Sequence, residues 1–270
     1  MPELPEVETT KRGIAPHIEG KKVSGVAVRQ PQLRWPIPAD LQTTLAGRKI
    51  KSVDRRAKYL LLKFNHGTLI IHLGMSGSLR IVPREEEPAK HDHFDLILAK
   101  SCLRLRDPRR FGAVLWTSDD PLEHKLLNHL GPEPLTPAFN GKQLHGLAQK
   151  RKTPVKTFIM DGKVVVGAGN IYANEALFMS RIHPQRPCNQ VSLEEYKTLA
   201  SHIKKVLKAA IKQGGTTLQD FQQSDGNPGY FAQKLQVYGK EGEPCPCCGR
   251  SISKEQIGQR SAFFCDHCQN

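Results

Sequence analysis

Two pairs of cysteines near the C-terminus constrain the fold more than any other feature of the chain. Cys245 and Cys248 form one C-x2-C pair, Cys265 and Cys268 form a second, and 16 residues separate them. At this spacing, two tight turns can direct four thiolates at one tetrahedral Zn²⁺. We therefore expect one structural zinc ion that builds a C-terminal β-hairpin and, because four cysteines leave no position open for water, performs no chemistry itself.

Cys247 and His267 lie inside these pairs and offer alternative ligands. The two-residue spacing followed by Gly249 favours Cys245 over Cys247, and we expect His267 to be a bystander. Disulfides are disfavoured, because five of the seven cysteines lie in the last 26 residues and are not spread through the chain as in a secreted framework. A tail this short also has too little core to fold without a metal.

The charge of the chain points to a polyanionic partner. Lys and Arg number 40 against 26 Asp and Glu, a formal net charge of +14. Nucleic acid is the first candidate, and a protein that is merely basic is the alternative. The sequence has neither a run of about 18 apolar residues nor the basic-then-apolar start of a signal peptide, so we expect a cytoplasmic protein without membrane contact.

The spacing of apolar runs predicts two different kinds of domain. After a helical opening segment, residues 22–118 read as short strands punctuated by Gly, Pro, Asn and Asp, which is typical of an antiparallel sandwich or barrel. The predicted strands are Val23–Val28, Tyr59–Phe64, Thr68–Leu73, Leu79–Val82, Phe94–Leu98, Leu103–Arg106 and Ala113–Trp116. The Pro/Gly cluster at residues 131–134 marks a boundary.

Beyond that boundary the sequence predicts helices. The clearest begins at a capping box formed by Ser192 and Glu195, carries one apolar stripe and ends at Gly214-Gly215. The stripe consists of Tyr196, Leu199, Ile203, Leu207 and Ile211. We expect three domains: an N-terminal β-sandwich over residues 1–131, a helical domain over 132–235 and the four-cysteine module over 236–270.

The second residue is a potential nucleophile. Once Met1 is removed, Pro2 carries a secondary α-amine, of which a useful fraction is uncharged at neutral pH. Attack on a sugar C1′ by a secondary amine gives an iminium that has no N–H to lose. This cationic intermediate favours elimination of the 3′ phosphate. Glu3 lies beside the amine, and Glu6 follows one turn later.

The opening Met1–Thr9 closely resembles the start of formamidopyrimidine-DNA glycosylases, and further motifs of that family follow in order over the whole chain. They are Arg55–Leu60, His72–Gly77, Lys90–His93, Asp107–Gly112, Gly167–Tyr172, Gln223–Gly226 and the zinc module. The resemblance implies an α+β fold: a leading helix, a β-sandwich, a helix-two-turn-helix domain and a zinc finger, with DNA held in a cleft. It also implies a monomeric, nucleoid-associated enzyme that excises oxidised purines such as 8-oxoguanine and cleaves abasic sites by β,δ-elimination.

Residue roles follow from the same resemblance. Pro2 matches the Schiff-base nucleophile, Glu3 the general acid/base, Lys58 a proton donor, and Arg260 the zinc-finger arginine that binds phosphates and is linked to δ-elimination. Ala262 stands where many relatives have threonine, so a minor hydroxyl contact is expected to be absent. The residues that match DNA contacts are His91, Arg110 and Arg151 for the backbone, Asn170 for a phosphate at a helix start, and Met75, Arg110 and Phe111 for filling the gap left by a flipped base.

Two alternatives remain open. An endonuclease VIII-type enzyme shares the fold and the Pro2 mechanism but prefers oxidised pyrimidines; Leu4 argues against it, because that branch usually has glycine there. A catalytically silent zinc protein that recognises damaged DNA is disfavoured by the intact Pro2, Glu3 and Lys58.

The polar loop from Thr216 to Tyr230 is expected to cover the flipped base.

Overall fold

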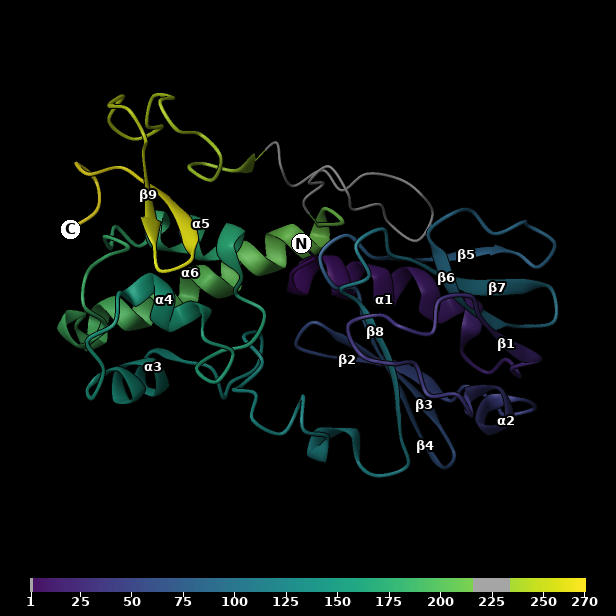
Figure 1. Ribbon diagram of the computed structural model, residues 1–270. Helices are drawn as coiled ribbons and strands as arrows, with labels where there is room; N and C mark the ends of the chain where they lie inside the picture. The colour runs from purple at the N-terminus through teal and green to yellow at the C-terminus, as the bar shows by residue number, and fades with distance from the viewer. Residues whose placement is uncertain (1, 216–233) are drawn as a thin grey trace. The chain divides into compact units, whose positions relative to one another are not determined.

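A computed structural model describes residues 2–215 and 234–270 (Figure 1). The chain divides into two compact units, of which the N-terminal unit contains Met1–Asn128 and Gln213–Ala232 and the C-terminal unit contains His129–Lys212 and Gln233–Asn270. Within the described part of the chain, no helix combines the length and the apolar character needed to cross a membrane.

Two four-stranded antiparallel sheets and one long helix supply most of the regular secondary structure described in the N-terminal unit. One sheet has the order β1-β6-β7-β5 and the other the order β2-β3-β4-β8. The elements are α1 (Leu4–Ile18), β1 (Gly25–Val28), α2 (Leu41–Leu45), β2 (Ser52–Arg56), β3 (Tyr59–Phe64), β4 (Gly67–His72), β5 (Ser78–Pro83), β6 (Asp92–Ile97), β7 (Ser101–Arg106), β8 (Ala113–Thr117) and the 3-10 turn η1 (Pro121–Glu123). The predicted antiparallel sandwich with a leading helix is confirmed.

The core of this unit joins α1 to both sheets. Val7, Ile14 and Ile18 of α1 are fully buried and share one apolar cluster with Leu60 of β3 and Leu103 of β7. The spacing of the helix residues places them on one face. Burial of this face therefore fixes α1, and with it the N-terminus of the chain, against the sandwich.

The C-terminal unit is helical and ends in a β-hairpin (Figure 1). Its elements are α3 (Gly141–Ala148), α4 (Val155–Met160), α5 (Asn170–Met179), the 3-10 turn η2 (Cys188–Gln190), α6 (Leu193–Lys212), β9 (Ser253–Ile257) and β10 (Arg260–Phe264). α5 is buried almost all round, from Ile171 to Phe178, and packs against both α6 and β10. Its position makes it the central element of this unit.

The helix predicted from the capping box is α6. The backbone N–H of Glu195 donates to Ser192 Oγ at 3.3 Å, and the N–H of Ser192 donates to Glu195 Oε2 at 2.8 Å. Tyr196, Leu199, Ile203 and Leu207 are buried, and Ile211 at the end of the stripe is half-buried. The helix stops before Gly214 and Gly215, whose φ values of +75° and +84° suit glycine.

Candidate functional site

The start of α1 holds Pro2 and Glu3. Both are buried, and Glu3, 3% exposed, is the N-cap residue of the helix. The Glu3 side chain accepts from the backbone of Glu6, and the Glu3 N–H donates to Glu6 Oε2 at 2.8 Å, so the two glutamates form a capping box. A β-carbon on Gly215 would lie 3.0 Å from Glu6 Oε1, so a larger residue there would displace this carboxylate.

Lys58 lies in the two-residue turn between β2 and β3. Arg56 and Tyr59 pair across the strands, which leaves Ala57 and Lys58 at the tip. Ala57 has a φ of +54°, a conformation that costs a residue with a β-carbon about 1 kcal/mol or more. The turn is therefore held by contacts from outside it.

Arg55 supplies such a contact and joins the Lys58 turn to α1. Its Nη1 donates to the carbonyl oxygen of Ala57 at 2.8 Å, and its Nε donates to Glu8 Oε2 at 2.9 Å. Burial by itself raises the pKa of Glu8, but hydrogen bonds from Arg55 and Arg12 outweigh burial and leave this pKa below its usual value. The carboxylate of Glu8 is thus ionised and paired at neutral pH.

His72, at the end of β4, lies near Lys58. Its ring contacts the ring of Tyr59 with centroids 4.8 Å apart, and its Nδ1 accepts from the N–H of Gly74 at 3.0 Å. Burial, together with the positive charges of Lys58 and Arg34, lowers the pKa of His72 from 6.5 to about 4. His72 is therefore neutral at pH 7. We gave it no role from the sequence, although it begins one of the matching motifs.

Three further loops of the N-terminal unit carry the predicted DNA contacts. Met75 is half-buried in the turn after β4, and His91 is half-buried just before β6. Arg110 and Phe111 lie in the loop before β8; Phe111 is 44% exposed, and Arg110 is exposed with a φ of +57°. The Arg109 guanidinium lies over the Phe111 ring, 5.0 Å from its centroid. The backbones of the Met75 turn and the Phe111 loop touch, because a β-carbon on Gly74 would lie 2.5 Å from the Phe111 carbonyl carbon.

In the C-terminal unit, Asn170 is the first residue of α5 and is half-buried. Gly169, not Asn170, is the N-cap residue, so the Asn170 side chain is not used as a cap. Arg151 lies before α4, where Nη1 donates to Asp161 Oδ2 at 3.2 Å and the guanidinium lies 5.5 Å from the Phe158 ring centroid. A phosphate contact by Arg151 would have to share or replace the Asp161 pair.

The four predicted zinc ligands come together in the C-terminal unit. The sulfur atoms of Cys245, Cys248, Cys265 and Cys268 all lie within 4.8 Å of one another. The Sγ atoms of Cys248 and Cys265 are 3.5 Å apart, and those of Cys245 and Cys268 are 3.9 Å apart. A tetrahedral zinc with Zn–S bonds of about 2.3 Å needs sulfur atoms about 3.8 Å apart, so the set fits one zinc ion.

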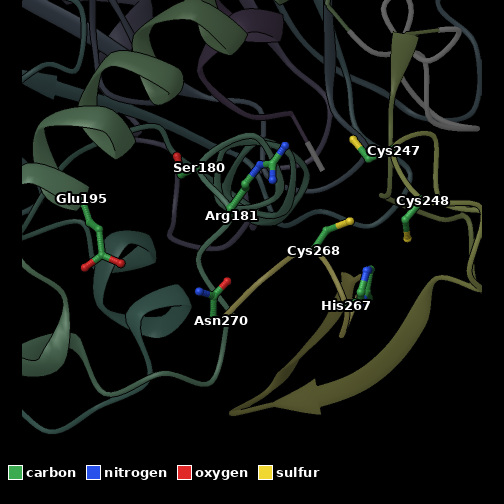
Figure 2. Close-up of a pocket in the computed structure, with 8 residues that line it drawn as sticks. All are labelled: Ser180, Arg181, Glu195, Cys247, Cys248, His267, Cys268 and Asn270. Carbon is green, nitrogen blue, oxygen red and sulfur yellow. The ribbon is translucent and has the colours of Figure 1, made fainter.

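Cys247 and His267 are outside this set; Figure 2 shows both of them beside Cys248 and Cys268. They line one side of a neighbouring pocket of about 440 Å³ together with Cys248 and Cys268; Ser180, Arg181, Glu195 and Asn270 complete its lining. Cys247 is exposed, and its N–H donates to Cys245 Sγ at 3.5 Å. Its main chain thus contacts a ligand sulfur, whereas its thiol is outside the cluster.

Arg260 begins β10 at the tip of the β9–β10 hairpin and is exposed. Its position depends on α5, since Asn174 Oδ1 accepts from the N–H of Phe263 at 2.8 Å and Asn174 Nδ2 donates to the carbonyl oxygen of Asn170 at 2.6 Å. One buried side chain thereby connects the start of α5 to the strand that carries Arg260. Ala262 is fully buried in a cluster with Ile257 and Phe264, so a side chain at this position lies on the buried face of the hairpin.

The zinc module is fixed to α5 by a second buried side chain. Glu175 is 3% exposed, and its carboxylate accepts from the backbone N–H groups of Gln236, Val237 and Tyr238 at 2.8, 3.0 and 2.9 Å. Because these are consecutive residues just before the first cysteine pair, Glu175 sets where the module begins. We did not identify this residue from the sequence, because a glutamate inside a predicted helix carries no sign of its partners.

Sequence comparisons match each part of the chain to known domains. Residues 1–114 match the formamidopyrimidine-DNA glycosylase N-terminal domain, residues 130–222 the formamidopyrimidine-DNA glycosylase H2TH domain, and residues 242–270 a zinc finger found in FPG and IleRS. A formamidopyrimidine-DNA glycosylase from Methylococcus capsulatus is 58% identical over 270 residues, which cover 100% of both chains.

Solved structures agree with these matches. A MutM (Fpg) protein from Thermus thermophilus superposes with a TM-score of 0.89 at 38% identity, over 99% of this chain and 98% of that one. A Lactococcus lactis Fpg in complex with DNA containing an abasic site gives a TM-score of 0.92 at 34% identity, over 99% of both chains. On the evidence of the full-length match, the three domains and the four-cysteine cluster, the chain belongs to the formamidopyrimidine-DNA glycosylase family.

Proposed function

We propose that this protein is a bifunctional DNA glycosylase and abasic-site lyase of base-excision repair. It removes oxidised purines, such as 8-oxoguanine and formamidopyrimidines, from duplex DNA and then cleaves the strand. The observation that carries the proposal is the arrangement at α1: Pro2 and Glu3 are held at the start of the helix, and Arg55 ties the Lys58 turn to the same helix.

Pro2 would act once Met1 is removed. Its amine nitrogen attacks C1′ of the damaged nucleotide, the bond to the base breaks, and an iminium forms as the sugar ring opens. Loss of a C2′ proton expels the 3′ phosphate, and a second elimination expels the 5′ phosphate. The positive end of the 15-residue α1 disfavours a positive charge on the free amine, which keeps it nucleophilic.

Glu3 and Lys58 would move the protons. Glu3 is next to the amine and fixed by its capping box, so its carboxylate can take the proton that the attacking amine loses and pass it to the ring oxygen as the sugar opens. Lys58 is half-buried beside His72, whose ring is neutral at pH 7, so Lys58 and not His72 is the proton donor that we propose on this side of the site. Both groups are presented by backbone that is fixed from α1.

The remaining candidate residues would hold the DNA. His91, Arg110, Arg151, Asn170 and Arg260 bind phosphates, with Arg260 also assisting the second elimination. Met75, Arg110 and Phe111 fill the gap left by the flipped base, which the 44% exposure of Phe111 supports. Cys245, Cys248, Cys265 and Cys268 hold one zinc ion, which keeps the Arg260 hairpin folded.

We also infer the setting in which the enzyme works. The domains 1–131, 132–235 and 236–270 act as one monomer on double-stranded DNA that contains oxidised bases or abasic sites. Chromosomal DNA is the substrate, so the location is cytoplasmic and nucleoid-associated. The predicted covering loop from Thr216 to Tyr230 lies outside the described residues.

The endonuclease VIII-type alternative is tested by rates and not by the mere presence of activity. A Lactococcus lactis Fpg has been solved with DNA that contains an oxidised pyrimidine, so pyrimidine damage alone does not separate the two classes. Leu4, fully buried in α1, favours the enzyme that acts on oxidised purines. The deciding quantity is the ratio of excision rates for the two kinds of lesion.

The test uses duplexes that carry 8-oxoguanine, an oxidised pyrimidine or an abasic site, with borohydride present to reduce the iminium to a stable amine. We expect covalent trapping with all three and the fastest excision with 8-oxoguanine. Faster excision of the pyrimidine would favour the endonuclease VIII-type enzyme. No trapping with any duplex would contradict both enzymes and would leave the catalytically silent DNA-binding protein as the remaining alternative.

A further inference from the structure

We propose that Asp107 is the positioning residue that holds the Met75 turn and the Arg110–Phe111 loop together, so that they enter the DNA as one unit. This inference rests on the proposed function, in which Met75, Arg110 and Phe111 fill the gap left by the flipped base. Asp107 itself is fully buried at 0% exposure and touches no solvent, so it is not a DNA contact.

The Asp107 side chain bridges the two loops directly. Its Oδ1 accepts from Ser76 Oγ at 3.3 Å, and its Oδ2 accepts from the backbone N–H of Gly112 at 2.7 Å. Ser76 follows Met75, and Gly112 follows Phe111. Each oxygen of one carboxylate therefore holds the residue next to a proposed gap-filling side chain.

The Asp107 main chain adds a third loop to this arrangement. Its N–H donates to the carbonyl oxygen of His91 at 3.0 Å. Its own carbonyl oxygen accepts from the N–H of Arg110 at 3.1 Å and from His93 Nε2, also at 3.1 Å. The hydrogen bond from Arg110 N–H closes the turn in which Arg110 has its positive φ. It therefore holds a proposed DNA-contacting residue in a backbone conformation that is unfavourable for residues other than glycine.

Close backbone packing makes the two loops depend on each other. A β-carbon on Gly74 would lie 2.5 Å from Gly112 N, and one on Gly112 would lie 2.8 Å from the His72 carbonyl oxygen and 2.9 Å from Asp107 Oδ2. Neither loop can shift without moving the other. The Asp107 carboxylate lies against the Gly112 backbone, and its hydrogen bonds to Gly112 N–H and Ser76 Oγ connect the two loops there.

Positioning matters here because two of the three proposed gap-filling residues, Arg110 and Phe111, are not held by burial. Phe111 is 44% exposed and Arg110 is exposed, so the protein interior does not fix their directions before DNA arrives. Their placement must come from the loop backbone. Without Asp107, both loops would have to be ordered during base flipping, and the lost entropy would slow that step.

The test compares Asp107→Ala, Asp107→Asn, Ser76→Ala and Phe111→Ala in the full-length, zinc-loaded protein. Two reactions are measured: single-turnover excision of 8-oxoguanine from a duplex, which requires flipping, and cleavage of an abasic site in a single-stranded oligonucleotide, which does not. A 2-aminopurine opposite the lesion reports, by its fluorescence, insertion into the duplex stack.

We expect Asp107→Ala to slow duplex excision by about tenfold or more and to reduce the fluorescence change, with single-strand cleavage kept within about twofold. Asp107→Asn should recover most of the loss, because an amide oxygen can accept from Gly112 and its nitrogen can donate to Ser76 Oγ. Ser76→Ala should have an intermediate effect. Val82→Ala, which creates a cavity in β5 away from these loops, is the control for lost stability.

Each contrary outcome identifies what fails. Loss of the fluorescence change in Phe111→Ala but not in Asp107→Ala would overturn the role of Asp107 and leave the proposed function standing. If Phe111→Ala gave the same 2-aminopurine fluorescence change as wild type, both the gap-filling role and this inference would be overturned. The proposed glycosylase activity would still be tested separately, by borohydride trapping. Equal losses in Val82→Ala and Asp107→Ala at matched stability would also refute positioning.

Discussion

Replacing Arg55 by methionine should both destabilise the protein and slow its chemistry. Within the described residues, the Arg55 guanidinium donates to Glu8 on α1 and to the Ala57 carbonyl in the Lys58 turn. The side chains of Arg55 and Glu8 are only 11% and 12% exposed. Methionine keeps most of the apolar stem but removes both bonds.

The structure sets the size of the effect. A hydrogen bond to a charged group contributes about 1.5–3 kcal/mol, and one to a neutral carbonyl about 1 kcal/mol. Arg12 and Lys11 remain close to Glu8 in the variant and offset part of the loss. We expect the free energy of unfolding to fall by about 2–3 kcal/mol. Because Ala57 would be freer to leave its positive φ, Lys58 would be misplaced and the trapping rate should fall by about tenfold or more.

Arg12→Met is the matched control. Arg12 Nε donates to Glu8 Oε1 at the same 2.9 Å, but its side chain is 62% exposed and this bond joins two residues of α1. Such an exposed pair contributes about 0–1 kcal/mol. Both variants are measured by urea unfolding at pH 7 and by single-turnover borohydride trapping on an 8-oxoguanine duplex.

The reasoning would be refuted if the two variants lost equal stability, or if Arg55→Met trapped DNA at the wild-type rate. A pH series adds a second check. The folded-state pKa of Glu8 is below its usual value of 4.5, so the Arg55 pair stabilises the protein above that value and less as the pH falls below it. The stability difference between wild type and Arg55→Met should therefore shrink in acid.

Three further predictions follow from other contacts. The pKa of His72 is about 4 in the folded protein and 6.5 in the unfolded chain, so between these pH values the unfolded chain binds an extra proton. Acidification from pH 6.5 to 4 should therefore lower the free energy of unfolding by up to about 3 kcal/mol, and His72→Gln should reduce this pH dependence in urea unfolding. Glu175→Ala leaves three backbone N–H groups without their acceptor and should lower the free energy of unfolding by about 3–5 kcal/mol, with Glu175→Gln losing less; equal losses would contradict the account. Chelation of zinc should abolish DNA binding in a gel-shift assay while far-ultraviolet circular dichroism retains the sandwich signal; full binding after verified zinc loss would show that the Arg260 hairpin needs no metal.

The features that local sequence patterns encode were predicted well. β3 was placed at Tyr59–Phe64 as observed, because its apolar run is bounded by turn residues. The zinc ligands followed from spacing alone, and Cys247 was correctly left out of the set. β2 was missed, because among Ser52–Arg56 only Val53 is apolar and buried, and an edge strand of this kind resembles a loop.

What the sequence did not reveal are contacts between distant segments. Glu8 and Arg55 are 47 residues apart, Ser76 and Asp107 are 31 apart, and no periodicity links them. The start of α1 was also unexpected in its detail, since glutamate is not among the preferred N-cap residues. These are the contacts that position the candidate site, and they depend on the tertiary fold.

The central claim is that the amine of Pro2 is the nucleophile, and one measurement tests it directly. The protein is prepared with a cleavable N-terminal extension and trapped with borohydride on an abasic-site duplex before and after cleavage exposes Pro2. We predict no trapping with the extension, full trapping after its removal, and DNA affinity that is the same in both forms. Equal trapping by the extended protein would show that another amine, such as that of Lys58, attacks the sugar, and would contradict the mechanism.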